Sequence, residues 1–356
     1  MKNFKHAALA TFFGLTCAGM GVACAQTTIG PKGEQATPSD TLVLSDDEVA
    51  QIKAGGFTAA FAWHTSSDYT TAVTAGATDE FKRLGIDVIA TTDAGYDAAR
   101  QRNDVETLMA KDPDIIISLP VDPVTSAEVF RTARDAGVQL VFIDNTPDGF
   151  RYGDDFVTVV TDDLYQMGKQ AADALAAALE NKGDVAWIYH DAEFYVTNQR
   201  DNAFKTTIEN DYPEMQIVDS AGIADPARAE EIAQALLTKN PDLDGIYVTW
   251  AEPAEGVLAT LRAFGDKTTK IVTLDLSEPI ALDMVKGGNT VAIIADEAYE
   301  LGRAAATAAT YGLLEKNTPP FIVAPALTVT KENVAQGWQT SLHRDAPPSI
   351  LDAVRE

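Results

Sequence analysis

A loop after the first strand-like run of the chain carries the residue types of a nucleophilic hydrolase. His64, Ser67 and Asp68 lie close together in "HTSSDY". A catalytic triad needs a base placed on the nucleophile and an acid that orients the base, and three neighbours on one short loop rarely reach that geometry. Ser67 also lacks the G-x-S-x-G turn of the α/β-hydrolases. The pattern leaves a hydrolase open without favouring it.

Two aspartates suggest other chemistry. Asp144 and Asp275 each follow a strand-like apolar run, and paired carboxylates are the machinery of a glycosidase. Carboxylates that accept hydrogen bonds from ligand hydroxyls explain the same residues. His64, His190 and His343 form no H-x-x-x-H or H-E-x-x-H pair, so we expect no metal site. The sequence has no P-loop or G-x-G-x-x-G fingerprint, so we expect no nucleotide cofactor.

The elements that position these residues alternate between strand-like and helical patterns. Val- and Ile-rich runs such as "DIIISLP" lack polar alternation, and helical segments such as 71–85 and 162–183 separate them. That order is typical of parallel sheets covered by helices on both faces. The strand-like runs span 57–63, 87–92, 114–120, 139–145, 156–161, 184–190, 215–222, 245–250, 270–276 and 291–296.

The second half of the chain repeats the order of the first. "KDPDIIISLPVDP" resembles "KNPDLDGIYVTWAEP", and "LVFIDN" resembles "IVTLDL", at offsets of 128 and 131 residues. We therefore predict an α/β fold of two similar doubly wound parallel-sheet lobes. Ligands of such sheets bind beyond the carboxyl ends of the strands, where the polar residues of this chain gather. The predicted site is a cleft between the two lobes.

The first residues and the charge indicate an exported protein. Lys2 and Lys5 precede a short apolar stretch, and "ACA" before Gln26 has the form of a cleavage site, so residues 1–25 are expected to be a signal peptide. Both cysteines lie within it, and a lipoprotein anchored at Cys24 is the alternative to a soluble mature protein. A net charge of −26 argues against a nucleic-acid partner, whose phosphates bind Lys and Arg patches.

The expected domain organisation follows from these patterns. Residues 26–56 form a flexible leader and a short helix, which Ser45 and Glu48 begin with a capping box. Lobe 1 comprises 57–161 and 297–324, and lobe 2 comprises 162–296 and 325–356.

From about Phe57 to Pro325 the chain resembles the ribose-binding family of periplasmic sugar-binding proteins, the solute receptors of ABC importers. The resemblance rests on the joint order of "AGATDEFKRLGIDVIATTDAGYDAARQRNDVETLMAKDPDIIISLPVDP", "DAGVQLVFIDN", "NQRDNAF", "LLTKNPDLDGIYVTWAEPAEGVLATLRAFG" and "ADEAYELG". It implies a periplasmic, monomeric binding protein rather than an enzyme, which delivers a sugar to a permease in the inner membrane. It also implies a three-segment hinge near Thr161, Asp296 and Pro325.

The resemblance further implies the residues of the site. The arginine that clamps the sugar matches Arg200, but the family's Asp-Arg pair matches Asp144 and Asn145, so one arginine is missing. The family's aromatic cover falls near Ala224 and is absent, and Trp250 is expected to replace it. The expected ligand-binding set is Trp63, His64, Ser67, Tyr69, Thr70, Asp144, Asn145, Arg200, Trp250, Asp275 and Asp296.

Three carboxylates and one guanidinium suit a neutral, hydroxyl-rich ligand. Asp144, Asp275 and Asp296 accept hydroxyl hydrogen bonds, and Arg200 donates to ligand oxygens. The excess negative charge disfavours sugar phosphates and sugar acids. We expect a pentose or a short polyol, such as a tetritol or pentitol.

Structural roles are open for the same residues. Tyr69 and Trp250 are alternatively core aromatics, Asp144 and Asp275 helix caps, and Arg200 a member of a surface ion pair. The alternative functions are a secreted hydrolase that uses His64 with Ser67 or Asp144 with Asp275, a ligand-sensing regulator, and a receptor that presents its ligand to a membrane sensor.

Overall fold

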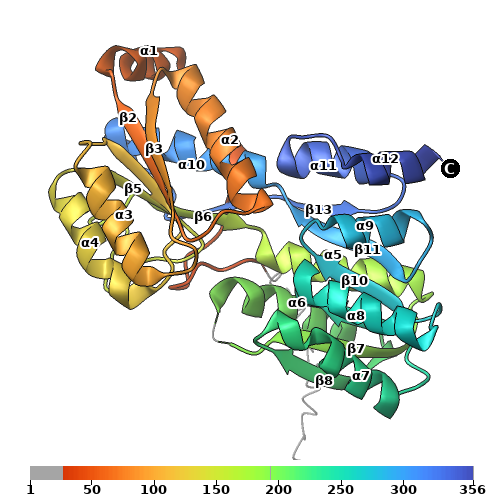
Figure 1. Cartoon of the computed structure of the whole chain (residues 1–356). Coiled ribbons are helices and arrows are strands. Elements are labelled where there is room, and N and C mark those ends of the chain that lie inside the picture. The colour runs from red at the N-terminus through yellow and green to blue at the C-terminus, as the bar shows by residue number, and fades with distance from the viewer. Residues whose placement is uncertain (1–26, 193, 356) are drawn as a thin grey trace, which may run out of the picture.

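The computed structural model describes residues 27–192 and 194–355 and contains two α/β lobes (Figure 1). The expected signal peptide and its cleavage site lie outside the described residues. Strands such as β4 (Ile115–Ser118) are buried along their whole length, as central parallel strands covered on both faces must be. The predicted fold class is confirmed. Within the described residues, no helix combines the length and apolar character needed to cross a membrane.

Lobe 1 contains a seven-stranded sheet in which all pairings are parallel. Alternate residues of one strand face opposite layers, so Phe61 joins the core under α2 and α10, whereas Ala62 joins the core under α3 and α4. The strands in spatial order are β1 (Thr37–Pro38), β12 (Phe321–Ala324), β6 (Thr158–Asp162), β5 (Gln139–Ile143), β4, β2 (Thr58–Trp63) and β3 (Asp87–Asp93). The helices are α1 (Asp46–Gly55), α2 (Asp68–Leu84), α3 (Ala98–Met109), α4 (Pro123–Asp135) and α10 (Ala298–Leu313).

Lobe 2 contains a six-stranded sheet, parallel except for its edge strand β13, which pairs antiparallel with β11. Helices α5 and α6 cover one face, and α7, α8 and α9 cover the other. The strands in spatial order are β13 (Ala326–Val329), β11 (Thr290–Asp296), β10 (Lys270–Leu274), β9 (Gly245–Val248), β7 (Lys182–His190) and β8 (Glu214–Ile223). The helices are α5 (Leu164–Ala178), α6 (Tyr195–Asp211), α7 (Ala229–Lys239), α8 (Ala251–Phe264) and α9 (Glu278–Val285).

The chain passes between the two sheets three times. Strand β6 ends at Asp162, and helix α5 of lobe 2 begins two residues later. Strand β11 ends at Asp296, and helix α10 of lobe 1 begins two residues later. Pro325 alone separates β12 of lobe 1 from β13 of lobe 2. Two of the three crossings therefore begin directly after an aspartate.

The start of helix α1 has the local structure that its sequence predicts. The backbone N–H of Glu48 donates to the Ser45 hydroxyl at 3.3 Å, and the Glu48 carboxylate accepts the Ser45 backbone N–H at 2.7 Å. This confirms the capping box. Gly56 ends the helix with a φ of 66°, in the left-handed region that glycine adopts readily.

Residues 27–38, which we call the N-terminal strap, contact both lobes. Strand β1 pairs with β12 in lobe 1. The Ile29 carbonyl accepts hydrogen bonds from the Gln199 side-chain amide at 2.9 Å and from the Tyr195 hydroxyl at 2.6 Å, both on α6. The Thr28 hydroxyl accepts the Tyr165 N–H at 2.8 Å. This differs from the flexible leader that the composition predicts, because the polar backbone of the segment finds partners on both lobes.

The C-terminal residues also lie across the two lobes. Helix α11 (Val334–Leu342) packs against α2 and α10 of lobe 1 and against β13 of lobe 2. His343 stacks on Tyr299 with ring centroids 3.9 Å apart, and Arg344 pairs with Asp68 at the start of α2. Helix α12 (Pro348–Arg355) packs against α9. The expected assignment of 325–356 to lobe 2 alone is therefore too simple.

The strap contacts predict a measurable coupling between the lobes. The change Gln199→Ala removes both hydrogen bonds between this side chain and Ile29, each worth about 0.5–1.5 kcal/mol. We expect the free energy of unfolding in urea to fall by about 1–2 kcal/mol and proteolysis within 27–38 to become faster. Gln234→Ala, an exposed change on α7, is the control. Equal unfolding midpoints and cleavage rates for both variants would contradict the bridging role.

Candidate functional site

Four aspartates lie at the carboxyl ends of strands, close to the crossings between the lobes. In lobe 1, Asp144 follows β5 and Asp162 ends β6. In lobe 2, Asp275 follows β10 and Asp296 ends β11. Asp144, Asp162 and Asp296 are buried, with 6–8% of their surface exposed, and Asp275 is half-buried. Each lobe thus contributes one aspartate after a strand and one beside a crossing.

Asp144 and Asp275 have the same unusual backbone conformation in the two lobes. Asp144 and Asp275 have φ values of 58° and 66°, in the left-handed region that non-glycine residues seldom adopt. The Asp144 N–H donates to the Val160 carbonyl at 3.1 Å, and the Asp275 N–H donates to the Ile294 carbonyl at 2.9 Å. Strained conformations of this kind are concentrated at functional sites. The equivalence supports the sequence repeat that places these two residues 131 positions apart.

One buried guanidinium faces these acids. Arg200 of α6 is 6% exposed, and it donates to Asp275 Oδ1 at 3.0 Å and to the Thr249 carbonyl at 3.3 Å. Helix α6 lies close to α5 at this point, because a Cβ atom on Gly168 would be 2.1 Å from the Arg200 carbonyl oxygen. Gly168 therefore sets the position of α6 and of the arginine that it carries.

Burial and mutual repulsion raise the pKa values of Asp144, Asp162 and Asp296. Burial raises the pKa of Asp144 to about 6, although a hydrogen bond from the Thr161 hydroxyl (2.5 Å) and the charge of Arg200 oppose the change. Burial and the charge of Asp275 raise the pKa of Asp296 to about 7, again against Arg200. One guanidinium thus offsets only part of the cost of ionising the buried acids.

Asp162, which the sequence analysis missed, belongs to the same group. Burial and the charges of Asp296 and Asp144 raise its pKa well above the ordinary value. Asp162 ends β6 beside a crossing just as Asp296 ends β11, so the internal repeat contained the signal that would have found it.

Three buried polar atoms at this place lack partners. The Tyr69 hydroxyl, Asp162 Oδ1 and Arg200 Nε make no hydrogen bond within the described parts of the chain. The pKa of the Tyr69 hydroxyl is raised well above 10, first by burial and then by the negative charges of the surrounding acids, which are Asp144, Asp162, Asp296 and Asp275. A polar molecule bound between the lobes would supply what these atoms lack. We call Tyr69, Asp144, Asp162, Arg200, Asp275 and Asp296 the inter-lobe site.

An aromatic pair lies next to this site in lobe 2. Trp250 is half-buried and follows Thr249, whose carbonyl binds Arg200. Its indole meets the His190 ring edge-on, with centroids 5.0 Å apart. His190 donates its backbone N–H to Asp201 at 2.8 Å, and burial lowers the pKa of its side chain. A neutral imidazole therefore supports Trp250.

Three other residues expected at the site, Trp63, His64 and Asn145, are partly or fully buried. Trp63 is 2% exposed, stacks on Phe61 and donates its indole N–H to Thr74 at 2.8 Å, which makes it a core residue of lobe 1. His64 is half-buried, and burial lowers its pKa to about 4. Asn145, beside Asp144, is also half-buried.

The hydroxyl groups of Ser67 and Thr70 accept hydrogen bonds from backbone N–H groups. Ser67 Oγ accepts the Thr70 N–H at 3.2 Å, and Thr70 Oγ1 accepts the Ser67 N–H at 2.9 Å, which is a capping box at the start of α2. Asp68 pairs with Arg344 rather than with His64. These three partnerships do not form a catalytic triad, because no base is placed on Ser67.

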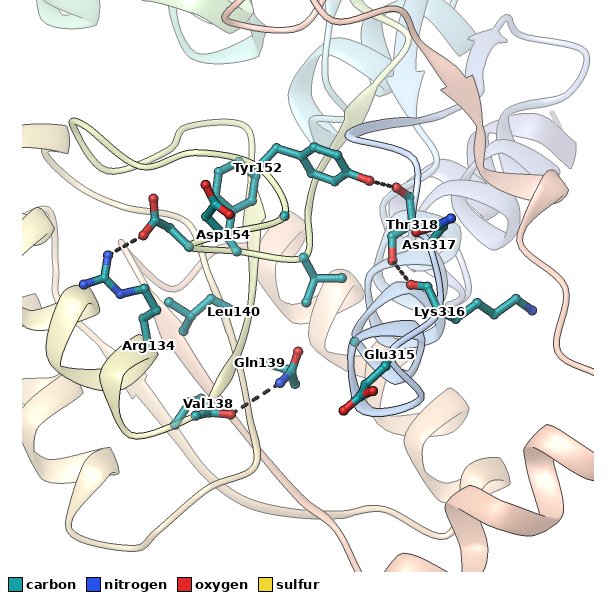
Figure 2. Close-up of a pocket in the computed structure, with 16 residues that line it drawn as sticks. Arg134, Val138, Gln139, Leu140, Tyr152, Asp154, Glu315, Lys316, Asn317 and Thr318 are labelled. Atoms are coloured by element: carbon teal, nitrogen blue, oxygen red, sulfur yellow. Dashed lines mark hydrogen bonds and ion pairs between the residues drawn. The ribbon is translucent and has the colours of Figure 1, made fainter.

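A separate cavity of about 380 Å³ lies at the opposite edge of the lobe 1 sheet (Figure 2). Several of its polar side chains already have protein partners: Arg134 pairs with Asp155, and the Tyr152 hydroxyl donates to the Thr318 carbonyl. Strand β5 begins here at Gln139, whereas the acids lie at the carboxyl ends of the strands. Within the described residues, no group of three or more His, Cys, Asp or Glu has the arrangement of a metal site.

Comparisons with known proteins agree with this architecture. The ribose import binding protein RbsB of Bacillus subtilis is 25% identical over 258 residues, which cover 72% of this chain and 81% of that protein. The arabinose binding protein AraP of Geobacillus stearothermophilus superimposes with a TM-score of 0.72 at 22% identity, covering 79% of this chain and 98% of that one. A sugar-binding protein of a sugar ABC transporter from Bacillus halodurans gives 0.69 at 25% identity, with coverages of 79% and 99%.

The family itself is assigned by the match of residues 59–316 to the periplasmic binding protein domain. This match makes the protein an extracytoplasmic binding protein rather than an enzyme, and the relatives it resembles are named as sugar-binding proteins of import systems. The chain belongs to the periplasmic binding protein family.

Proposed function

We propose that the protein binds a neutral pentose or short polyol at the inter-lobe site and delivers it to a membrane permease. The observation that carries this proposal is the set of unpartnered buried atoms, Tyr69 Oη, Asp162 Oδ1 and Arg200 Nε, which come from both lobes. Hydroxyl groups both donate and accept hydrogen bonds, so a polyhydroxylated ligand satisfies the carboxylates and the guanidinium together.

Charge supports a neutral ligand. Four carboxylates and one guanidinium repel sugar phosphates and sugar acids. Aromatic cover comes from Trp250, which packs beside the site and suits the C–H face of a sugar. Ligands within this fold vary in size: a protein from Agrobacterium vitis was solved with alpha-D-tagatopyranose, and one from Mycobacterium smegmatis with glycerol. A ligand of three to six carbons is consistent with that range.

Binding is proposed to close the lobes about the three crossings after Asp162, after Asp296 and at Pro325. A ligand shifts such an equilibrium only by its difference in affinity for the two states, so contacts from both lobes are required. The inter-lobe site meets this condition, since Asp144 and Tyr69 belong to lobe 1 and Arg200 and Asp275 to lobe 2. We also propose cleavage of the signal peptide after Ala25 and a monomeric mature protein.

Substitution of the two strained aspartates tests the ligand. Asparagine tolerates the left-handed backbone, so Asp144→Asn and Asp275→Asn remove the charge without forcing the chain to move. We expect each to weaken binding of the best pentose or polyol roughly 10- to 100-fold, the range for about 1.5–3 kcal/mol lost with a hydrogen bond to a charged group. Thermal-shift screening, followed by calorimetric titration, measures this.

The matched control for these substitutions is Asp112→Asn, an exposed aspartate whose φ is 55°. It changes the same charge in the same backbone conformation away from the site, and it should leave affinity unchanged. If no pentose, tetritol, pentitol, hexose or inositol raises the melting temperature of the unsubstituted protein, the proposed ligand class is wrong. If Asp144→Asn and Asp275→Asn bind the ligand as tightly as Asp112→Asn does, then Asp144 and Asp275 do not contact the ligand.

Ligand binding is expected to release protons. In the free protein Asp144 and Asp296 hold protons up to pH values near their pKa values of about 6 and about 7. Ligand hydroxyls that donate to carboxylates favour the ionised form and lower these pKa values, so affinity rises as pH increases from about 5 to about 7. Calorimetric titration at pH 6.5 in phosphate and in Bis-Tris measures the released protons, since the two buffers differ in ionisation enthalpy. Identical enthalpies in both buffers, or proton uptake, would contradict this assignment.

A further inference from the structure

A second cavity, of about 370 Å³, lies in lobe 2 between β7 and the first turns of α6. Its lining includes Trp187 and Tyr189 from the strand, Asp191 from the loop, and Asn198 and Asn202 from the helix. None of these five residues belongs to the inter-lobe site. Aromatic rings, amides and a carboxylate that converge on one cavity are the side chains from which proteins build sites for hydroxylated rings.

The floor of this cavity is a pair of parallel rings. Trp187 and Tyr189 stack with centroids 4.4 Å apart and an angle of 25° between their planes, and both side chains are half-buried. Their partners on the edge strand β8 are Ser220 and Gly222. Both rings therefore have small residues as register partners at the edge of the sheet. A Cβ atom on Gly222 would be 2.7 Å from the Asp191 Cβ atom, so the Asp191 side chain packs over this position.

Polar groups surround the rings. The Trp187 indole N–H is buried and has no acceptor within 27–192 and 194–355. A buried donor without an acceptor is destabilising, so an acceptor supplied by a ligand would be stabilising. Asn198 and Asn202 lie one helical turn apart on α6 and therefore on the same face of the helix, where each amide offers donors and an acceptor. Asp191 adds an acceptor for hydroxyl groups.

We propose that this cavity is a second carbohydrate site, which takes one neutral sugar ring packed against the stacked pair of Trp187 and Tyr189. C–H groups of the sugar contact the surface that the pair leaves uncovered, its hydroxyl groups bond to Asn198, Asn202 and Asp191, and one of its oxygens accepts the indole N–H. His190 also lines the cavity and contacts Trp250 of the neighbouring site, so the two sites are adjacent but are built from different side chains.

The four tryptophans make the two sites separable by nuclear magnetic resonance. Protein labelled with ¹⁵N at the indole groups gives one signal each for Trp63, Trp187, Trp250 and Trp338, and Trp187→Phe assigns the relevant one. The probes are D-glucose, D-arabinose and myo-inositol, each raised to 100 mM. At least one is expected to shift the Trp187 signal saturably, with a midpoint different from that of any Trp250 shift. The midpoint of this shift should stay unchanged in Asp275→Asn, which is expected to raise the midpoint of the inter-lobe site roughly 10- to 100-fold.

Two exposed substitutions on the same helix complete the test. Asn202→Ala is expected to weaken the Trp187 response at least fivefold, whereas Asn210→Ala, two turns further along α6, should leave it unchanged. A Trp187 signal unmoved by all three sugars would overturn the proposal, and so would an equal response in Asn202→Ala. A Trp187 midpoint that rises in Asp275→Asn together with the Trp250 midpoint would also overturn it, because the change would then come from the inter-lobe site.

Discussion

Repulsion among buried carboxyl groups is the constraint on which the inter-lobe site depends. Asp144, Asp162 and Asp296 lie out of water at the crossings, and Arg200 offers them a single guanidinium that is already paired with Asp275. Ionising all of them would place several like charges in a low dielectric, so burial and repulsion raise their pKa values. Under the proposed function, hydroxyl groups of the ligand supply hydrogen-bond donors to these acids. Because the acids lie on both lobes, the proposed binding and the proposed lobe closure are then coupled.

The two lobes place their aspartates with the same backbone conformation, but the partners of the two carboxylates differ. Asp144 and Asp275 share a left-handed conformation and an N–H bond to the neighbouring strand. In lobe 1 the carboxylate then receives a hydroxyl, from Thr161, whereas in lobe 2 it receives a guanidinium, from Arg200. A hydroxyl stabilises a buried carboxylate less than a cation does. The duplicated scaffold therefore presents two equivalent aspartates whose partners differ, one a neutral hydroxyl and the other a guanidinium.

Local patterns in the sequence predicted the fold well, and they singled out most of the charged residues that gather near the crossings. Unbroken apolar strands admit only sheets covered on both faces, so the two-lobed architecture followed from periodicity and from the internal repeat. Tyr69, Asp144, Arg200, Asp275 and Asp296 were singled out, and they now form one electrostatic group. Trp63, Ser67 and Thr70 were assigned to the ligand because sequence shows residue type but not the partner that already occupies a hydroxyl or indole group. The strap was misjudged for a related reason: its composition indicates weak local structure, whereas its order comes from distant residues such as Gln199.

The strap and the C-terminal helices add non-covalent links to the three covalent crossings. The strap joins β12 of lobe 1 to α6 of lobe 2, and Arg344, which follows α11, pairs with Asp68 of lobe 1. These contacts are largely exposed, so each contributes about 1 kcal/mol or less. Their sum is nevertheless comparable with the few kcal/mol that separate two states of a hinged protein. Such links are too weak to hold the lobes in one arrangement. They can shift the equilibrium between the open and closed states that we propose, and the apparent affinity for a ligand depends on that equilibrium.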